Sequence, residues 1–208
     1  LLVDVSGSSL FGTSKRLKRE LITEVSAVLS FSAATNNDKV GVIFFSDKVE
    51  KFIPPKKGRS HILRIIRELI ALEPEQKAGT NIKAALEYLN QVQKKKSITF
   101  LMSDFISEPY EQQLQLAARK HDLVGIQIYD KHDRELPQAG LVQLMDAESG
   151  IMQWVDTDDK SVRAQYANSF DQHQKYCIQA FRKSGAQLLD IRTDADYVKS
   201  LQTFFKAR

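Results

Sequence analysis

The sequence is poor in cysteine and in long apolar runs. Its 208 residues include one cysteine, Cys177, which excludes an internal disulfide and is typical of a reducing compartment. We expect this thiol to lie in a core helix. No apolar stretch approaches the roughly 18–20 residues that cross a bilayer, and no signal peptide is visible. We therefore expect a cytoplasmic protein with no membrane segment in this chain.

The start of the chain bears on this expectation. The sequence opens inside an apolar strand and has no initiator methionine. We interpret residues 1–208 as a single domain that forms the C-terminal part of a longer protein. A membrane anchor further upstream is compatible with this interpretation.

Residue patterns of several enzyme and nucleic-acid-binding classes are also missing. The segment Ser6-Gly7-Ser8-Ser9 lacks the Gly-Lys-Ser/Thr of a phosphate-binding loop. The net charge is +4, but no aromatic residues interleave the basic clusters, so we do not expect nucleic-acid binding. The histidines are scattered and show no zinc-ligand spacing: His61, His121, His132 and His173.

What is present is an alternation of apolar strands with amphipathic helices. Strands are predicted at 1–5, 39–46, 97–103, 123–129 and 187–191. Helices are predicted at 14–34, 60–72, 110–120, 160–184 and 194–207, and another opens at Thr80. This order predicts an α/β fold: a doubly wound, mostly parallel sheet with helices on both faces.

Three further predicted strands depart from the parallel pattern. Residues 49–53 alternate apolar and charged side chains, which predicts a short antiparallel edge strand that Pro54-Pro55 stops. Residues 141–144 and 151–155 predict a hairpin through the turn at 146–150. We expect Trp154, in the second strand of this hairpin, to lie in the core.

The N-terminal strand leads into the segment richest in chemistry. Asp4, Ser6 and Ser8 place one carboxylate and two hydroxyls at alternate positions directly after Leu1-Leu2-Val3. Oxygen-only ligands of this kind suit Mg²⁺, Mn²⁺ or Ca²⁺ rather than zinc or copper. The segment therefore predicts a loop that wraps a small hard cation.

Two distant residues are placed to complete the site. Asp104 ends the strand at 97–103, and Thr80 opens a helix behind Gly79. Ligands of a doubly wound sheet bind beyond the carboxyl ends of its strands, where the winding reverses. If the first strand pairs with the strand ending at Asp104, Asp4 and Asp104 meet there, and a divalent cation relieves their repulsion.

The predicted ligand set leaves room in the ion's coordination shell. Two carboxylates and three hydroxyls do not fill the roughly six positions that Mg²⁺ demands. We therefore expect an open position that water, or an acidic residue of a partner protein, completes. This is a binding mechanism and not a catalytic one, so we do not expect an enzyme.

Two alternatives remain open at this point. Asp-x-Ser-x-Ser alone is a common turn, so the domain could be purely structural. A Mg²⁺-dependent phosphohydrolase on a similar sheet is the other alternative. Such an enzyme normally has a second acid two positions after its nucleophilic carboxylate, where this chain has Ser6, and no histidine is placed as a base.

The five residues resemble the metal-ion-dependent adhesion site of von Willebrand factor type A domains. Asp4, Ser6 and Ser8 match its first motif, Thr80 its second and Asp104 its third. More narrowly, the chain resembles the bacterial domain-of-unknown-function group associated with MoxR-type AAA+ ATPases. The resemblance implies a Rossmann-like von Willebrand A fold with a Mg²⁺ site. It also implies assembly or maturation of other proteins beside such an ATPase.

Overall fold

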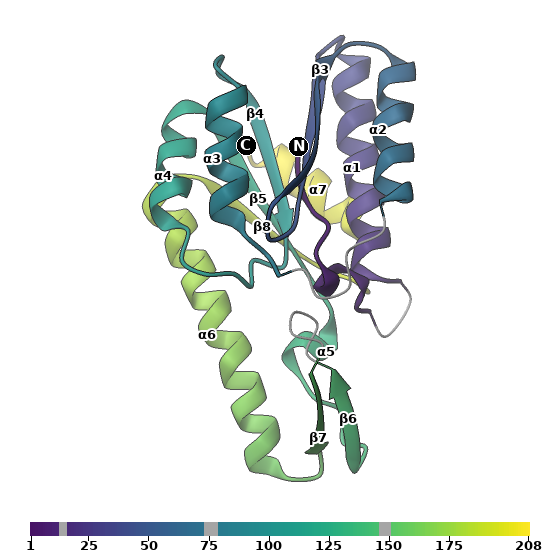
Figure 1. Ribbon diagram of the computed structural model, residues 1–208, viewed down its shortest axis with the longest axis vertical. Helices are drawn as coiled ribbons and strands as arrows, with labels where there is room; N and C mark the ends of the chain where they lie inside the picture. Colours follow the sequence, from purple (N-terminus) through teal and green to yellow (C-terminus); the bar gives the residue numbers. More distant parts are fainter. Residues whose placement is uncertain (13–15, 73–78, 146–150) are drawn as a thin grey trace.

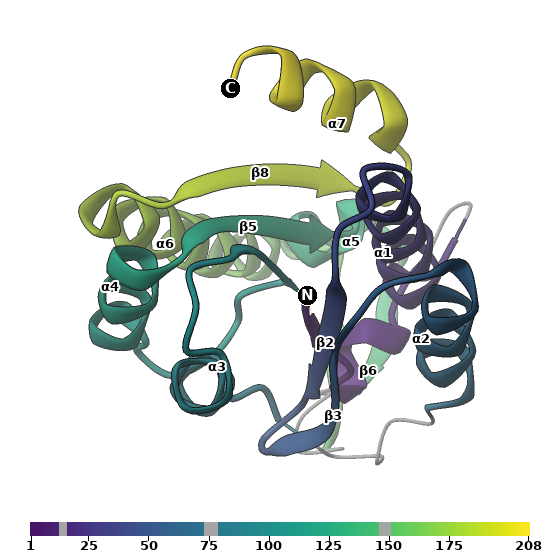
Figure 2. The same ribbon diagram turned by 90° about the horizontal axis from the view of Figure 1, so that it is seen from above.

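The computed structural model describes residues 1–12, 16–72, 79–145 and 151–208. Its main sheet has six strands in the order β3-β2-β1-β4-β5-β8 (Figures 1 and 2). All neighbours are parallel except β2 and β3. The strands are β1 (Leu2–Asp4), β2 (Val40–Phe45), β3 (Val49–Lys56), β4 (Ile98–Ser103), β5 (Asp122–Tyr129) and β8 (Gln187–Arg192). The predicted fold class and edge strand are confirmed.

Helices cover both faces of this sheet. One apolar core joins it to α1 (Lys18–Thr35), α2 (Arg59–Ala71) and α7 (Tyr197–Lys206). A second core joins the opposite face to α3 (Ile82–Val92), α4 (Glu111–Lys120) and α6 (Lys160–Ser184). Strand residues alternate between the two cores, as Leu2 and Val3 do, because successive side chains point to opposite faces. Cys177 is buried in the second core, as expected.

Strand β3 runs further than predicted. Pro54 and Pro55 lie inside it and do not stop it. A proline is tolerated on an edge strand because one side of that strand needs no ladder partner. The neighbouring residue Gly41 makes room for the proline ring, since a Cβ there would lie 2.9 Å from Pro55. Edge position and glycine together explain the longer strand.

Several local boundaries also differ from the prediction. Helix α2 begins at Arg59, one residue before the predicted start, and follows Gly58, whose φ of 102° favours glycine. Helix α1 begins at Lys18, and Ser14, where we predicted its start, lies outside the described residues. Two short elements were not predicted: a 3₁₀ turn, η1 (Gly7–Leu10), and a one-turn helix, α5 (Lys131–Arg134).

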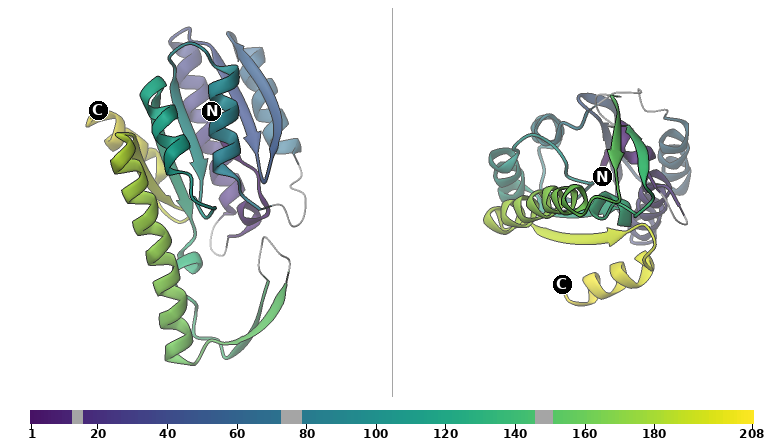
Figure 3. Two further views of the ribbon diagram at one scale, coloured as in Figure 1. Left: turned by 60° about the vertical axis from the view of Figure 1, so that its left-hand side comes forward. Right: turned by 90° about the horizontal axis from the view of Figure 1, so that it is seen from below.

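The predicted hairpin forms outside the main sheet. Strands β6 (Leu141–Met145) and β7 (Met152–Asp156) pair with each other, and α5 precedes them (Figures 1 and 3). Their predicted turn at 146–150 lies outside the described residues. Trp154 is 67% exposed, so the expectation that it lies in the core was wrong. A two-stranded ribbon has no second layer to cover its outer face, which leaves this ring in solvent.

Candidate metal site

The site lies where the first strand ends. Strand β1 pairs with β2 on one side and with β4 on the other, so the winding of the sheet reverses beside it. The register sets Val3 opposite Met102, which brings the residues that follow each of them to the same edge. Asp4 and Asp104 therefore meet at this edge, as the sequence predicted, although 100 positions separate them.

Three hydroxyls gather next to the Asp4 carboxylate. Thr80 Oγ1 lies 2.9 Å from Ser6 Oγ and 3.4 Å from Asp4 Oδ2. The Oγ atoms of Ser6 and Ser8 are 3.2 Å apart. Turn η1 begins at Gly7 and keeps Ser8 beside Ser6, while Thr80 reaches in from the segment before α3. Four of the five predicted ligands thus form one connected group of oxygens.

Asp4 is buried at the centre of this group. It is 3% exposed and accepts hydrogen bonds from Ser6 N at 2.9 Å and from Ser103 Oγ at 2.5 Å. Burial, with a further contribution from the charge of Asp104, raises the pKa of Asp4 to about 6 despite these bonds. A buried carboxylate with a raised pKa is a group that a cation would stabilise in its charged form.

The charge of Asp104, the fifth predicted ligand, acts on Asp4, but both carboxylate oxygens of Asp104 contact other groups. Its Oδ1 accepts a bond from Ile106 N at 3.2 Å, and its Oδ2 lies 3.1 Å from Nζ of Lys18. The same ammonium lies 3.1 Å from Oδ2 of Asp133. Burial opposes the charge of Lys18, but Asp104 and Asp133 outweigh it and hold the pKa of the ammonium above its ordinary value.

A strained backbone turn presents Asp104. Phe105 has a φ of 62°, a left-handed conformation that bulky residues rarely adopt. Its N–H bonds Ser103 Oγ at 3.0 Å, and its ring packs edge-on against Phe181 with centroids 5.2 Å apart. Packing in the core thus offsets the strain, and the chain turns sharply straight after β4.

The donor set fits a hard divalent cation. Asp4, Ser6, Ser8 and Thr80 offer only oxygen atoms, which Mg²⁺, Mn²⁺ and Ca²⁺ prefer. Among the described residues, no group of three or more His, Cys, Asp or Glu side chains could hold a metal, so the hydroxyls are essential to such a site. Ion coordination by these residues stays a prediction, because the structure shows the arrangement of the oxygens alone.

The sequence prediction missed two residues of the site, Ser103 and Lys18. Lys18 belongs to one of the basic clusters, at residues 15–19, of which Lys15 lies outside the described residues. A signal was available: Lys18 precedes the buried Leu21, Ile22 and Val25 at helical spacings of three, four and seven, which places it on the buried face. Ser103 carried no comparable signal.

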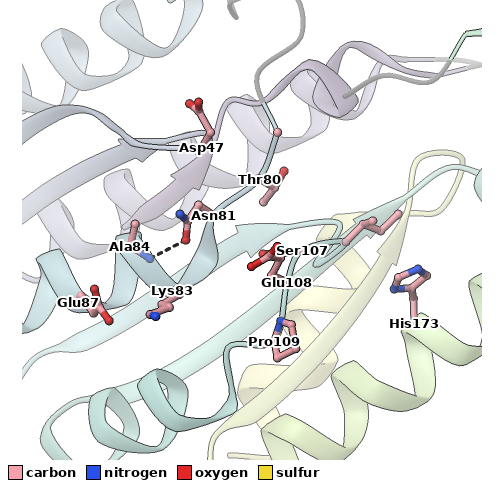
Figure 4. A pocket seen from close by; sticks show the side chains of 12 residues that line it. Asp47, Thr80, Asn81, Lys83, Ala84, Glu87, Ser107, Glu108, Pro109 and His173 are labelled. Carbon is pink, nitrogen blue, oxygen red and sulfur yellow. Dashed lines mark hydrogen bonds between the residues drawn. The ribbon is translucent and has the colours of Figure 1, made fainter. Parts of the chain in front are cut away.

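A groove opens next to Thr80. It has a volume of about 560 Å³ and lies between α3, the loop that follows β4, and α6 (Figure 4). Acidic and basic side chains share its walls, and His173 of α6 faces it from the side opposite α3. Asn81 caps α3 there by accepting from Ala84 N at 2.9 Å. Of the five predicted ligands, Thr80 lines this groove.

Comparisons with known proteins agree on family and fold. The uncharacterised protein Rv1480 of Mycobacterium tuberculosis is 29% identical over 211 residues, covering 100% of this chain. The chain spans only 66% of the length of that relative.

Two solved structures share the fold over nearly the whole chain. BatB from Bacteroides thetaiotaomicron has a TM-score of 0.60 at 15% identity, covering 99% of this chain and 94% of its own. An aerotolerance-related membrane protein from Bacteroides fragilis has a TM-score of 0.63 at 17% identity, covering 97% and 93%. At these identities the likeness concerns the fold alone.

The cytoplasmic location expected from the sequence is corrected by this second structure. The same fold occurs in a protein described as a membrane protein, so the lack of a long apolar run here does not indicate a cytoplasmic location. No helix in the described part of the chain has the length and apolar character to cross a bilayer.

A family model supplies the identity that these distant neighbours do not. The model named "Protein of unknown function DUF58" matches residues 1–176, which include all five predicted ligands and most of the sheet. The chain belongs to the DUF58 family.

Proposed function

We propose that the chain is a metal-dependent protein-binding module. In this proposal Asp4, Ser6, Ser8, Thr80 and Asp104 hold one divalent cation, most simply Mg²⁺. The observation that carries it is the connected group of oxygens at the end of β1, with Thr80 Oγ1 within 3.4 Å of both Asp4 Oδ2 and Ser6 Oγ. When bound, the ion would supply a Lewis-acidic position that an outside oxygen can occupy.

The partner in this proposal offers an acidic side chain. The two carboxylates of the ligand set only balance the charge of a divalent ion, and the five oxygens leave about one of its roughly six coordination positions open. An outside carboxylate can fill that position. The proposal assigns the chain no chemistry of its own.

The groove beside Thr80 supports a protein as the partner. Its volume of about 560 Å³ suits an extended peptide segment. Its walls carry Asp47, Glu87 and Glu108 against Lys83, so the attraction for an acidic residue would come from the ion and not from the groove. The sequence resemblance described above extends the proposal to a MoxR-type ATPase and its client proteins. On that reading, the module helps such an ATPase to assemble or mature other proteins.

Thermal unfolding tests the metal site directly. We expect Mg²⁺ or Mn²⁺ to raise the melting temperature of the chain by several degrees over chelator, because a ligand that binds only the native state stabilises it. Asp4→Ala should abolish this rise. The matched control is Asp47→Ala, which removes an aspartate that lines the neighbouring groove and should keep this rise. Identical wild-type curves in metal and in chelator would refute the proposal.

Partner binding needs a separate measurement. We expect the full-length protein to capture a partner from its own cells in Mg²⁺, and to lose it in chelator and in the Asp4→Ala variant. Replacing the partner's contacting Glu or Asp by Gln or Asn should then weaken binding by about tenfold or more. Turnover of phosphate esters that depends on Mg²⁺ and on Ser6 would favour the phosphohydrolase instead.

A further inference from the structure

Lys18 is a lysine in an unusual place. It is the first residue of α1, and 3% of its side chain is exposed. Burying an ammonium is costly, and an apolar side chain of similar size often stabilises a fold as well or better. Stability alone therefore does not account for a charge at this position.

The contacts of Lys18 suggest what the charge does. Its Nζ holds Oδ2 of Asp104 at 3.1 Å, while Ile106 N holds Oδ1 of the same carboxylate at 3.2 Å. Both oxygens of this predicted ligand are thus engaged by donors of the chain itself. The ammonium also offsets one of the two negative charges that Asp4 and Asp104 bring to the site.

A second carboxylate balances the position of the ammonium. Asp133 Oδ2 lies 3.1 Å from Lys18 Nζ and also accepts from Asp130 N at 2.7 Å, which fixes it in the first turn of α5. Lys18 is therefore shared between one acid inside the predicted ligand set and one outside it. The attraction of Asp133 for the Lys18 ammonium weakens the interaction between that ammonium and Asp104.

We propose that Lys18 is a tethered counter-cation that lowers the affinity of the site for a divalent ion, so that stable occupancy depends on the partner's carboxylate. This inference rests on the proposed function. Lys18 competes with the ion for Asp104, and Asp133 moderates that competition. Because Lys18 competes for Asp104, the ion's charge is less fully neutralised by the chain, and the ion attracts the partner's carboxylate more strongly.

Titration calorimetry with Mn²⁺ and Mg²⁺ on the whole chain tests the inference. Lys18→Met removes the competing charge and should tighten ion binding by about tenfold or more. Asp133→Asn leaves Lys18 to Asp104 alone and should weaken ion binding by roughly threefold or more. Lys18→Arg keeps the charge and should stay within about threefold of wild type.

The opposite signs separate an electrostatic role from a structural one. Both variants break the same buried ion pair, so a merely structural role moves the two affinities in the same direction and overturns the inference. If Lys18→Met does not fold without metal, a double variant, Lys18→Met with Asp133→Asn, replaces it. We expect the double variant to bind the ion more tightly than Asp133→Asn alone. Equal binding by the two overturns the inference.

The wild type distinguishes this inference from the proposed function. If wild type binds the ion and the variants do not follow the expected order, the inference alone fails. If wild type binds no ion, the proposed function fails, and the inference that rests on it fails with it.

Discussion

At the scale of single residues, Asp4 combines three properties that favour a cation. It is 3% exposed, the charge of a second carboxylate acts on it, and the hydroxyls of Ser103 and Thr80 lie within 3.4 Å of its Oδ2. Without a cation, its charged form is unfavourable in the folded protein, and its pKa of about 6 reflects this. The protonation of Asp4 therefore couples the stability of the fold to pH and to metal binding.

The pH dependence of stability in chelator follows from this pKa. A folded-state pKa raised from 3.8 to about 6 means that the native state binds the proton more tightly. The stabilisation from Asp4 is then complete below pH 3.8 and is lost as the pH rises through about 6. Relative to an Asp4→Asn variant, the wild type should lose roughly 2–3 kcal/mol of unfolding free energy over this window in urea titrations.

Divalent metal should reverse that trend. The ion binds the charged carboxylate, so its stabilising effect grows as the pH rises through about 6, the pKa of Asp4. Melting temperatures with Mg²⁺ and with chelator should therefore converge in acid and separate above neutrality. A metal effect that is constant with pH would show that Asp4 is not a ligand.

At the scale of elements, the contact between β5 and α6 leaves no free space. Gly125 lies in the middle of β5, and a Cβ there would come within 2.4 Å of the Phe181 ring and 2.9 Å of Leu188. Phe181 also packs against Phe105, which turns the chain after β4. A glycine in a strand thus connects the packing of α6 to the loop that presents Asp104.

We expect Gly125→Ala to destabilise the protein by about 1–3 kcal/mol, because the added methyl group overpacks the core. Urea unfolding followed by circular dichroism measures this loss. Phe181→Leu gives up the ring that the methyl group would meet, so the two substitutions should cost less together than their sum. If the two losses of unfolding free energy simply added, the methyl group would not clash with the Phe181 ring.

Elements also show what the sequence could and could not predict. The strands β1, β2, β4 and β5 are nearly continuous apolar runs, and their pattern alone predicts a buried parallel sheet. The short turns η1 and α5 were not predicted, because a single turn has no periodicity to detect. The edge strand extended through Pro54 and Pro55 because tertiary context at Gly41, invisible to local propensity, accommodates the ring.

The candidate site, too, could be predicted only in part from the sequence. The ligand types and their convergence followed from motifs at strand ends, since parallel strands end at one edge of the sheet. The ion pairs of Lys18 did not, because Asp133 lies 115 positions away in a turn that no pattern predicted. Long-range polar contacts among single side chains leave little trace in local sequence.

At the scale of the whole molecule, the chain divides into a doubly wound body and a hairpin beside α6 (Figures 1 and 3). Within the described residues, β6 and β7 pack mainly against each other. Four large apolar side chains on one face of this ribbon are 51–67% exposed: Leu141, Met145, Met152 and Trp154. The body holds the candidate site. Among the described residues, the hairpin contributes no oxygen atom to that site.

Trp154 is the single tryptophan and so reports on the hairpin alone. We expect a solvent-like emission maximum and efficient quenching by acrylamide, because the ring is 67% exposed. Trp154→Ser should change the free energy of unfolding by about 0.5 kcal/mol or less. A matched core substitution, Phe181→Ala, should cost about 3–5 kcal/mol. Blue-shifted emission that resists acrylamide would contradict the described hairpin.

The route of β1 through the sheet has a consequence for biosynthesis. Ser103 bonds Asp4 across 99 positions, and β1 sits between two strands that emerge later from the ribosome. An N-terminal fragment that ends before β4 carries Asp4, Ser6, Ser8 and Thr80 but lacks Ser103 and Asp104. In a growing chain the proposed ion site would therefore be complete only after β4 has joined β1, before β5 and β8 extend the sheet.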